Sequence, residues 1–228
     1  MSWLSNYLSS SIGRKQLMAV TGLMLCGFLI VHLLGNFTLF AGYSTETIDG
    51  KIVEVCAFNK YAHALTANKA ILFLAELILL AIFGSHIYLA LTLSLENRAA
   101  RGNVRYDVNA KAGPMTLSSA TMPYTGSWIL LFLVLHVATF RFTDHTSIEM
   151  GLYGLVSDTF QNPLWTIFYI VSLFLVAAHV KHGFQSCLQT IGFNHPKYNG
   201  MIQTVSTVYA IFIFVGFSSI PLWFIFTR

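Results

Sequence analysis

The sequence predicts an all-α membrane protein with five transmembrane helices. Of its 228 residues, 55% are hydrophobic and only 10% are charged, and the mean hydropathy is +0.65. A soluble domain usually carries about 25% charged residues. The charges gather between five long apolar runs, and no linker or low-complexity tract divides the chain. We therefore expect a single integral-membrane domain over residues 1–228.

Each apolar run can cross the hydrocarbon core, which takes about 20 helical residues. We expect spans near Leu17–Phe40, Ala70–Leu95, Met122–Phe142, Leu164–Leu188 and Val205–Phe226. Pro123 falls in the first turn of the third span, where proline is well tolerated. The first run is too long for a signal-peptide core, so we expect a retained helix. The 41–69 loop has room for a short surface helix.

Lysine and arginine in the short loops predict the orientation of the chain. One side carries most of these residues, and the other carries most of the loop carboxylates. We therefore expect a cytoplasmic N-terminus and an outer C-terminus. The basic inner residues are Arg14, Lys15, Arg98, Arg101, Arg105, Lys111, Lys181 and Lys197. Topology accounts for the net charge of +4, so nucleic acid is not an expected partner.

Four histidines lie deep inside four different spans, where an ionisable side chain is costly and marks a candidate functional site. His32 and His136 lie about 8 and about 6 residues before the outer ends of their spans, both roughly 10 Å deep. His86 and His179 lie about 15 residues in, or roughly 23 Å. A b-type haem needs two axial nitrogens at one level on separate helices. The depths predict a bundle of the first four helices around two b-type haems, in preference to four packing histidines.

The first and third spans share an internal repeat. The strings TGLMLCGFLIVH and TGSWILLFLVLH place Gly22 and Gly126 ten residues before the histidine. Ten residues correspond to roughly 15 Å, which brings both glycines near the level of the deeper histidine pair. A missing side chain there lets a flat macrocycle approach the backbone. Packing of helices through small residues is the alternative.

The string HVKHGFQS offers a second histidine in the fourth span. His182 lies one turn beyond His179 and follows Lys181. Either histidine can be the ligand, and we favour His179, because His182 and Lys181 are expected where haem propionates or lipid headgroups lie. The cysteines form no CxxC or CxxCH motif. This excludes a covalently attached haem and argues against a zinc or iron–sulfur site.

The chain resembles the dihaem cytochrome b subunit of succinate dehydrogenases and quinol:fumarate reductases, in the five-helix class (the cytochrome b558 type). The matching strings are HLLGN, FNKYAH, SHIYLAL, HVATFR and HVKHG, and they cover all four histidine-bearing spans. The resemblance implies that His32 and His136 bind the distal haem, and that His86 and His179 bind the proximal one. A glycine follows the fourth ligand by four residues in this family, and Gly183 selects His179.

The resemblance implies a membrane-anchor subunit of a succinate:quinone oxidoreductase (complex II) in the bacterial inner membrane. A flavoprotein and an iron–sulfur subunit would dock on its cytoplasmic face. The chain is then one subunit of an oxidoreductase, and its lack of a Rossmann glycine pattern agrees with this. Two alternatives stay open. One is the cytochrome b anchor of a hydrogenase or formate dehydrogenase, which typically has four helices. The other is a transporter, which predicts inverted repeats with broken helices.

The resemblance further implies menaquinone as the quinone, and we expect it near the outer haem. The candidate contacts are Asn36, Asn59, His63 and Glu76. Asn36 can instead cap its helix, and His63 can be a solvated surface residue. Glu76 is the only carboxylate well inside a span. It can relay protons to a quinone, or it can pair with Lys69 or Arg141 at the interface.

Overall fold

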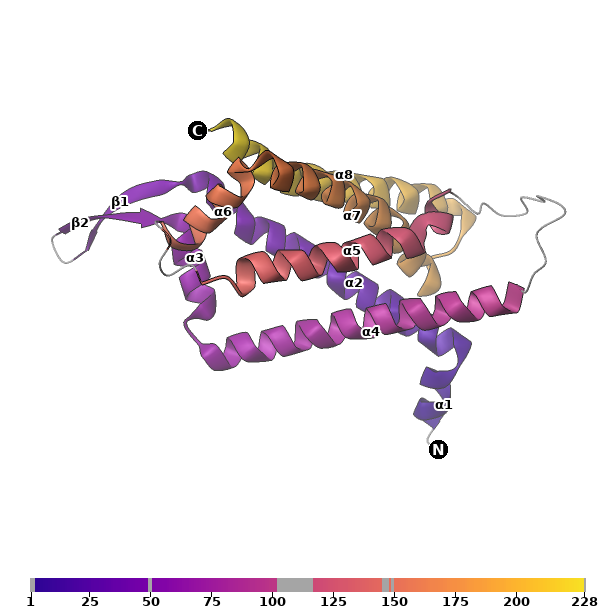
Figure 1. Ribbon diagram of the computed structural model, residues 1–228. Helices are drawn as coiled ribbons and strands as arrows, with labels where there is room; N and C mark the ends of the chain where they lie inside the picture. The colour runs from indigo at the N-terminus through magenta and orange to yellow at the C-terminus, as the bar shows by residue number, and fades with distance from the viewer. Residues whose placement is uncertain (1–2, 49–50, 102–116, 145–147, 149, 228) are drawn as a thin grey trace. The chain divides into compact units, whose positions relative to one another are not determined.

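The computed structural model describes residues 3–48, 51–101, 117–144, 148 and 150–227. This part of the chain is helical except for one β-hairpin (Figure 1). The elements are α1 (Trp3–Ser9), α2 (Ser11–Asn36), the 3-10 helix η1 (Phe37–Ala41), β1 (Tyr43–Ile48), β2 (Lys51–Cys56), α3 (Ala57–Thr66), α4 (Lys69–Arg101), α5 (Leu117–Arg141), α6 (Gly151–Gln161), α7 (Pro163–Thr190) and α8 (Pro196–Phe226).

Five of the described helices are long and apolar enough to cross a membrane, and each corresponds to a predicted span. They cover Ser11–Ala41, Lys69–Ala100, Thr121–Arg141, Pro163–Thr190 and Pro196–Phe226. Large apolar side chains such as Leu80, Leu164 and Val208 are exposed on these helices. Such surface suits contact with lipid tails better than contact with water. The prediction of an all-α, multi-pass membrane protein is confirmed at this level.

Polar caps set the starts of several spans. Ser10 Oγ accepts a hydrogen bond from the Gly13 N–H at 3.0 Å, and α2 therefore begins at Ser11, before the predicted Leu17. Asn68 Oδ1 accepts from the N–H groups of residues 70 and 71 at 3.1 Å each, ahead of α4. Side-chain oxygens of this kind satisfy the first free N–H groups of a helix. The spans are longer than the apolar runs because the capping residues lie outside them.

The helix of the third span differs from its prediction at the N-terminal end. Helix α5 begins at Leu117, so Pro123 lies inside the helix and not in its first turn. Proline lacks the N–H that would bond to the preceding turn. Membrane helices tolerate this because neighbouring groups satisfy the freed carbonyl. The apolar span itself begins at Thr121, which agrees with the predicted start near Met122, and only the helix extends further back, to Leu117.

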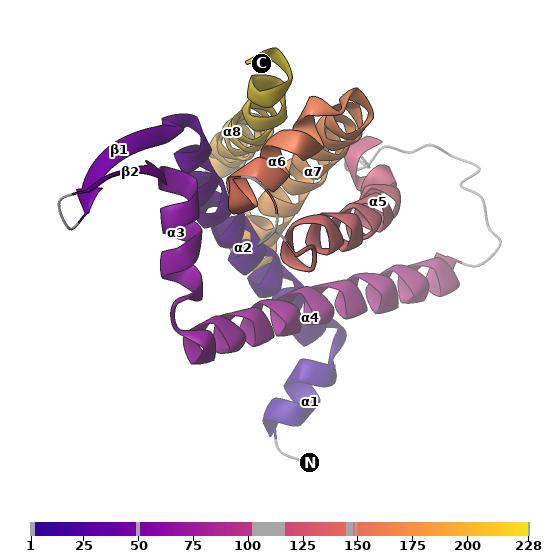
Figure 2. The ribbon, with the colours of Figure 1, turned by 60° about the vertical axis from the view of Figure 1, so that its left-hand side comes forward.

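The 41–69 segment holds more structure than the predicted short surface helix. Helix α3 is that helix, and a hairpin precedes it in which β1 and β2 pair antiparallel from Tyr43↔Cys56 to Ile48↔Lys51. Helix α3 lies against η1, β2 and α6, and Figure 2 shows it following β2 directly. The sequence analysis anticipated neither the hairpin nor α6. Both belong to the loops on one side of the predicted spans.

The chain divides into two compact units. Unit 1 comprises residues 1–27, 77–127 and 178–210, and unit 2 comprises residues 28–76, 128–177 and 211–228. Every long helix therefore supplies a segment to each unit. His86 and His179 belong to unit 1, whereas His32 and His136 belong to unit 2. Each histidine pair predicted from depth thus falls within one unit.

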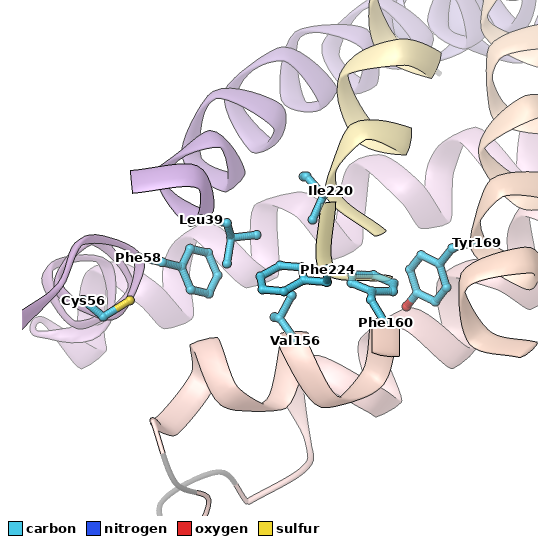
Figure 3. Close-up of a cluster of buried hydrophobic side chains, with 8 residues drawn as sticks. All are labelled: Leu39, Cys56, Phe58, Val156, Phe160, Tyr169, Ile220 and Phe224. Carbon is cyan, nitrogen blue, oxygen red and sulfur yellow. The ribbon is translucent and has the colours of Figure 1, made fainter. Parts of the chain in front are cut away.

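Unit 2 has a compact apolar core next to the segments that connect the spans on the side of the hairpin and α6. Side chains from η1, β2, α3, α6, α7 and α8 meet there (Figure 3). They are Leu39, Cys56, Phe58, Val156, Phe160, Tyr169, Ile220 and Phe224. In unit 1, the Tyr209 hydroxyl of α8 donates to the Cys26 carbonyl of α2 at 2.7 Å. The fifth helix, which carries no histidine, is thus packed into both units.

Candidate functional site

His32 of α2 and His136 of α5 face each other in unit 2. Their ring centroids are 5.8 Å apart and the ring planes are perpendicular. Aromatic rings surround the pair: Phe28, Phe132, Phe140, Tyr169 and Phe217 each lie within 6.1 Å of one of the two imidazoles, centroid to centroid. Phe217 comes from α8, at 5.6 Å from the His32 ring. The sequence predicts that only the first four long helices surround this pair. In the structure the fifth long helix, α8, also contacts it.

Both imidazoles of unit 2 use Nδ1 for contacts with the protein. The Tyr169 hydroxyl lies 3.2 Å from His136 Nδ1. Asn36 Nδ2 donates to the His32 carbonyl at 2.7 Å and lies 3.5 Å from His32 Nδ1. Histidines that bind metals commonly engage one ring nitrogen in this way and bind through the other. This makes Nε2 the candidate ligand atom of His136, whose Nδ1 has the Tyr169 hydroxyl as a possible acceptor, but it does not apply to His32, because the Asn36 amide nitrogen only donates.

The separation of the two rings fits a metal held between them. Metal–imidazole bonds are about 2 Å long, so two of them in line place the ring centroids roughly 6 Å apart. The observed 5.8 Å agrees with this value. Among the described residues, no group of three or more His, Cys, Asp or Glu side chains could hold a bare metal ion. Two imidazoles alone suit a metal whose other ligands come from a macrocycle.

His86 of α4 and His179 of α7 are held in unit 1 by a matching contact. Thr21 Oγ1 lies 3.2 Å from His86 Nδ1, and Thr125 Oγ1 lies 3.1 Å from His179 Nδ1. As at His136, Nδ1 faces the protein and Nε2 is the candidate ligand atom. His136, His86 and His179 thus each have a hydroxyl oxygen beside Nδ1, whereas His32 has an amide nitrogen there.

The glycines of the Thr-Gly repeat lie against these two imidazoles. A Cβ built on Gly22 would be 3.4 Å from His86 Cε1 and 3.0 Å from Cys187 Sγ. A Cβ built on Gly126 would be 3.5 Å from His179 Cε1. The structure thus places both glycines beside the unit 1 pair, where each leaves room for a ring. The tightest neighbour at Gly22 is Cys187 Sγ, whereas the distance at Gly126 is an ordinary van der Waals contact with the imidazole.

His182 lacks the environment of His179. It is half-buried on α7, and no side chain of the described residues is hydrogen-bonded to its ring, whereas His179 has Thr125 and Gly126 beside it. Lys181 is exposed. His145 lies outside the described residues, and His195 Nδ1 accepts from the Lys197 N–H at 3.2 Å. These contacts favour His179 over His182 as the candidate ligand of the fourth span.

The candidate quinone contacts all belong to unit 2, and each has its own surroundings there. Both ends of the Asn59 amide bind the start of α6: Nδ2 donates to the Met150 carbonyl at 2.8 Å, and Oδ1 accepts from the Tyr153 N–H at 3.0 Å. His63 is exposed on α3. Glu76 accepts a hydrogen bond from Arg141 Nε at 2.7 Å. The structure thus gives Asn59 a structural role and realises the Glu76–Arg141 pair, one of the two roles open to Glu76.

Sequence reasoning missed the residues that orient the histidines. Thr21 and Thr125 belong to the Thr-Gly repeat, so the repeat could have indicated them. The sequence-based interpretation of the repeat considered only its glycines. Tyr169 is buried at 4% exposure, and nothing in its sequence context separates it from other aromatic residues. The same holds for Phe217. Contacts between distant helices can be found only once the helices are packed.

The strings HLLGN and FNKYAH meet in the structure. A Cβ on Gly35 would overlap Oη and Cζ of Tyr61, so the Tyr61 ring of α3 lies directly against the Gly35 backbone. Overpacking of this kind typically costs about 1–3 kcal/mol. We expect Gly35→Ala to loosen α3 and to lower the thermal unfolding temperature. Gly27→Ala is the matched control, because no atom lies within 4 Å of its Cβ position. Equal unfolding temperatures for the two variants would contradict the contact.

Comparison of the chain with protein-family models, with curated proteins and with solved structures finds no match. The four histidines, their contacts and the sequence strings around them are therefore the basis for a functional proposal.

Proposed function

We propose that the chain is the dihaem membrane anchor of a succinate:quinone oxidoreductase. The observation that carries the proposal is the set of four intramembrane histidines on four helices, divided into two pairs, each with a polar contact at Nδ1. Ionisable groups inside a membrane span are costly and by default mark a functional site. The sequence strings around the same histidines support the same class of protein.

The residues divide the work between two haem sites. Nε2 of His32 and His136 would hold the outer haem, and Nε2 of His86 and His179 the inner one. A b-type haem bound there supplies one-electron transfer. The protein residues fix the ring orientations through Tyr169, Thr21 and Thr125, and aromatic side chains exclude water from the outer site. Menaquinone is the proposed quinone, on the side of the outer haem.

The haem proposal has a direct test. We expect the purified wild-type chain to show b-type α and Soret bands in a reduced-minus-oxidised spectrum, with about two haems per chain by pyridine haemochrome assay. A protein without a b-type band would overturn the haem sites and favour the transporter alternative. Two haems without a co-purifying flavoprotein and iron–sulfur subunit would favour another redox complex, such as a hydrogenase or formate dehydrogenase.

We propose that the basic inner surface docks the iron–sulfur subunit. Arg98 is exposed near the end of α4 and Lys197 at the start of α8. The Arg101 side chain, Arg105 and Lys111 lie outside the described residues. Charge reversal at Arg101 and Arg105 should reduce co-purification of the partner subunits and leave the haem spectrum intact. Unchanged co-purification would assign this surface to topology and anionic lipid.

A further inference from the structure

Unit 1 contains the same three-residue arrangement twice. On α2, Thr21 and Gly22 face His86, and on α5, Thr125 and Gly126 face His179. We propose that Thr21 and Thr125 are positioning residues that hold both imidazoles in the Nδ1–H tautomer and thereby lower the reduction potential of the inner haem. This inference rests on the proposed haem function and adds residues to it.

The proton of each threonine hydroxyl is committed to the threonine's own helix. Thr21 Oγ1 lies 2.9 Å from the Leu17 carbonyl and 3.0 Å from the Met18 carbonyl. Thr125 Oγ1 lies 3.2 Å from the Thr121 carbonyl and 3.1 Å from the Met122 carbonyl. A hydroxyl has one proton to donate and two lone pairs that accept. Since the proton goes to a carbonyl, the oxygen is left to accept from the imidazole.

The imidazole must then carry its proton on Nδ1. Both hydroxyls are buried, at 6% exposure for Thr21 and 8% for Thr125, so bulk water does not compete for the contact. In a neutral imidazole, a protonated Nδ1 leaves the lone pair on Nε2. The hydrogen-bond network thus selects the tautomer that binds a metal through Nε2. The glycine beside each threonine lies next to the same ring, at 3.4 Å and 3.5 Å from its Cε1 atom to the Cβ position of Gly22 and Gly126.

The unit 2 pair is supported differently. His136 meets the Tyr169 hydroxyl, whereas His32 meets the amide nitrogen of Asn36 at 3.5 Å. An amide nitrogen is a donor and cannot accept the Nδ1 proton. Only the unit 1 pair has a threonine hydroxyl beside Nδ1 of both rings, and the His86 ring also bonds to the Met18 backbone. An acceptor at Nδ1 makes the imidazole a more basic ligand. A more basic ligand favours ferric iron, so these hydroxyls should lower the potential of the haem that they serve.

The test replaces each hydroxyl and follows the two haems separately. Thr21→Val and Thr125→Val remove the acceptor at nearly constant volume, and Thr21→Ser and Thr125→Ser keep it. Thr92→Val is the matched control, because Thr92 Oγ1 also bonds to its own helix, at 2.9 Å from the Tyr88 carbonyl and 3.2 Å from the Leu89 carbonyl, with no histidine contact. The readouts are the midpoint potentials from a redox titration of the haem bands and the EPR signals of the ferric haems.

We expect an upward shift of one midpoint in each valine variant, a larger shift in the double variant, and no shift in the serine and Thr92→Val proteins. The shifted signal should be the one that His86→Ala removes. Unchanged midpoints in the valine variants would overturn the inference and leave the haem sites standing. If the valine variants lose the haem, the serine variants decide: native potentials support a hydroxyl requirement, and loss or a shift refutes it. A wild-type protein without haem would refute the proposed function itself.

Discussion

Replacing His86 or His179 by alanine is expected to remove one haem signal and to leave the other, and replacing His32 or His136 should do the reverse. Each haem needs two axial nitrogens, and the pairs lie in separate units of the chain. Loss of one ligand opens a coordination site, so haem loss or conversion to a high-spin form follows. The measurement is haem content per chain with EPR of the ferric state. If all four variants lost both signals, the division into two independent sites would be refuted.

The fourth span supplies a matched control for this experiment. His182 lies on the same helix as His179 but has no described side-chain partner, whereas His179 contacts Thr125 at 3.1 Å. We therefore expect His182→Ala to keep both haems. Retention of both haems in His179→Ala with loss of one in His182→Ala would transfer the ligand role to His182. Because both histidines lie on α7, a difference between the two variants reports haem ligation and not a general disturbance of the helix.

Hydropathy was sufficient to predict the five spans because a bilayer demands long uncharged helices. It could not predict their ends. Helix α8 begins at Pro196, well before the predicted Val205, because polar residues such as Gln203 and Thr204 continue the helix beyond the apolar run. The hairpin was missed although Asp49-Gly50 stands between its strands, a dipeptide that favours two-residue hairpin turns. Its strands have only six residues each, so their alternation of polar and apolar residues is a weak signal for β-structure.

The pairing of the histidines followed from depth, since helical rise converts residue number into level. The orienting partners did not follow from it. Tyr169 reaches His136 from α7, and Phe217 reaches His32 from α8. Which side of a helix meets which neighbour depends on packing that a single sequence does not determine. Asn59 was predicted as a quinone contact because it is polar and lies in the string FNKYAH. In the structure its amide bonds to the backbone at the start of α6, a helix that was not predicted from the sequence.

Glu76→Gln should reduce quinone-linked turnover while dye-linked succinate oxidation and both haems are spared. Glu76 belongs to the same unit as His32 and His136, and its carboxylate is held by Arg141 at 2.7 Å with partial exposure of both side chains. A carboxylate so placed can deliver protons to a quinone, and glutamine keeps the hydrogen bond but carries no transferable proton. A positioned proton donor typically contributes at least roughly 100-fold to a rate. We expect a loss of that order in quinone-linked assays of the intact complex.

Glu96→Gln is the control that separates proton delivery from loss of an ion pair. Glu96 also lies on α4 and pairs with Arg14 at 2.5 Å, in unit 1. If ion pairs of α4 matter only for assembly, the two glutamine variants should behave alike. If Glu76 serves the quinone, its variant alone should lose turnover, and His63→Ala should lose part of it, since an exposed imidazole can pass protons between water and the site. Normal quinone reduction in both Glu76→Gln and His63→Ala would move the quinone site to the side of the His86–His179 pair.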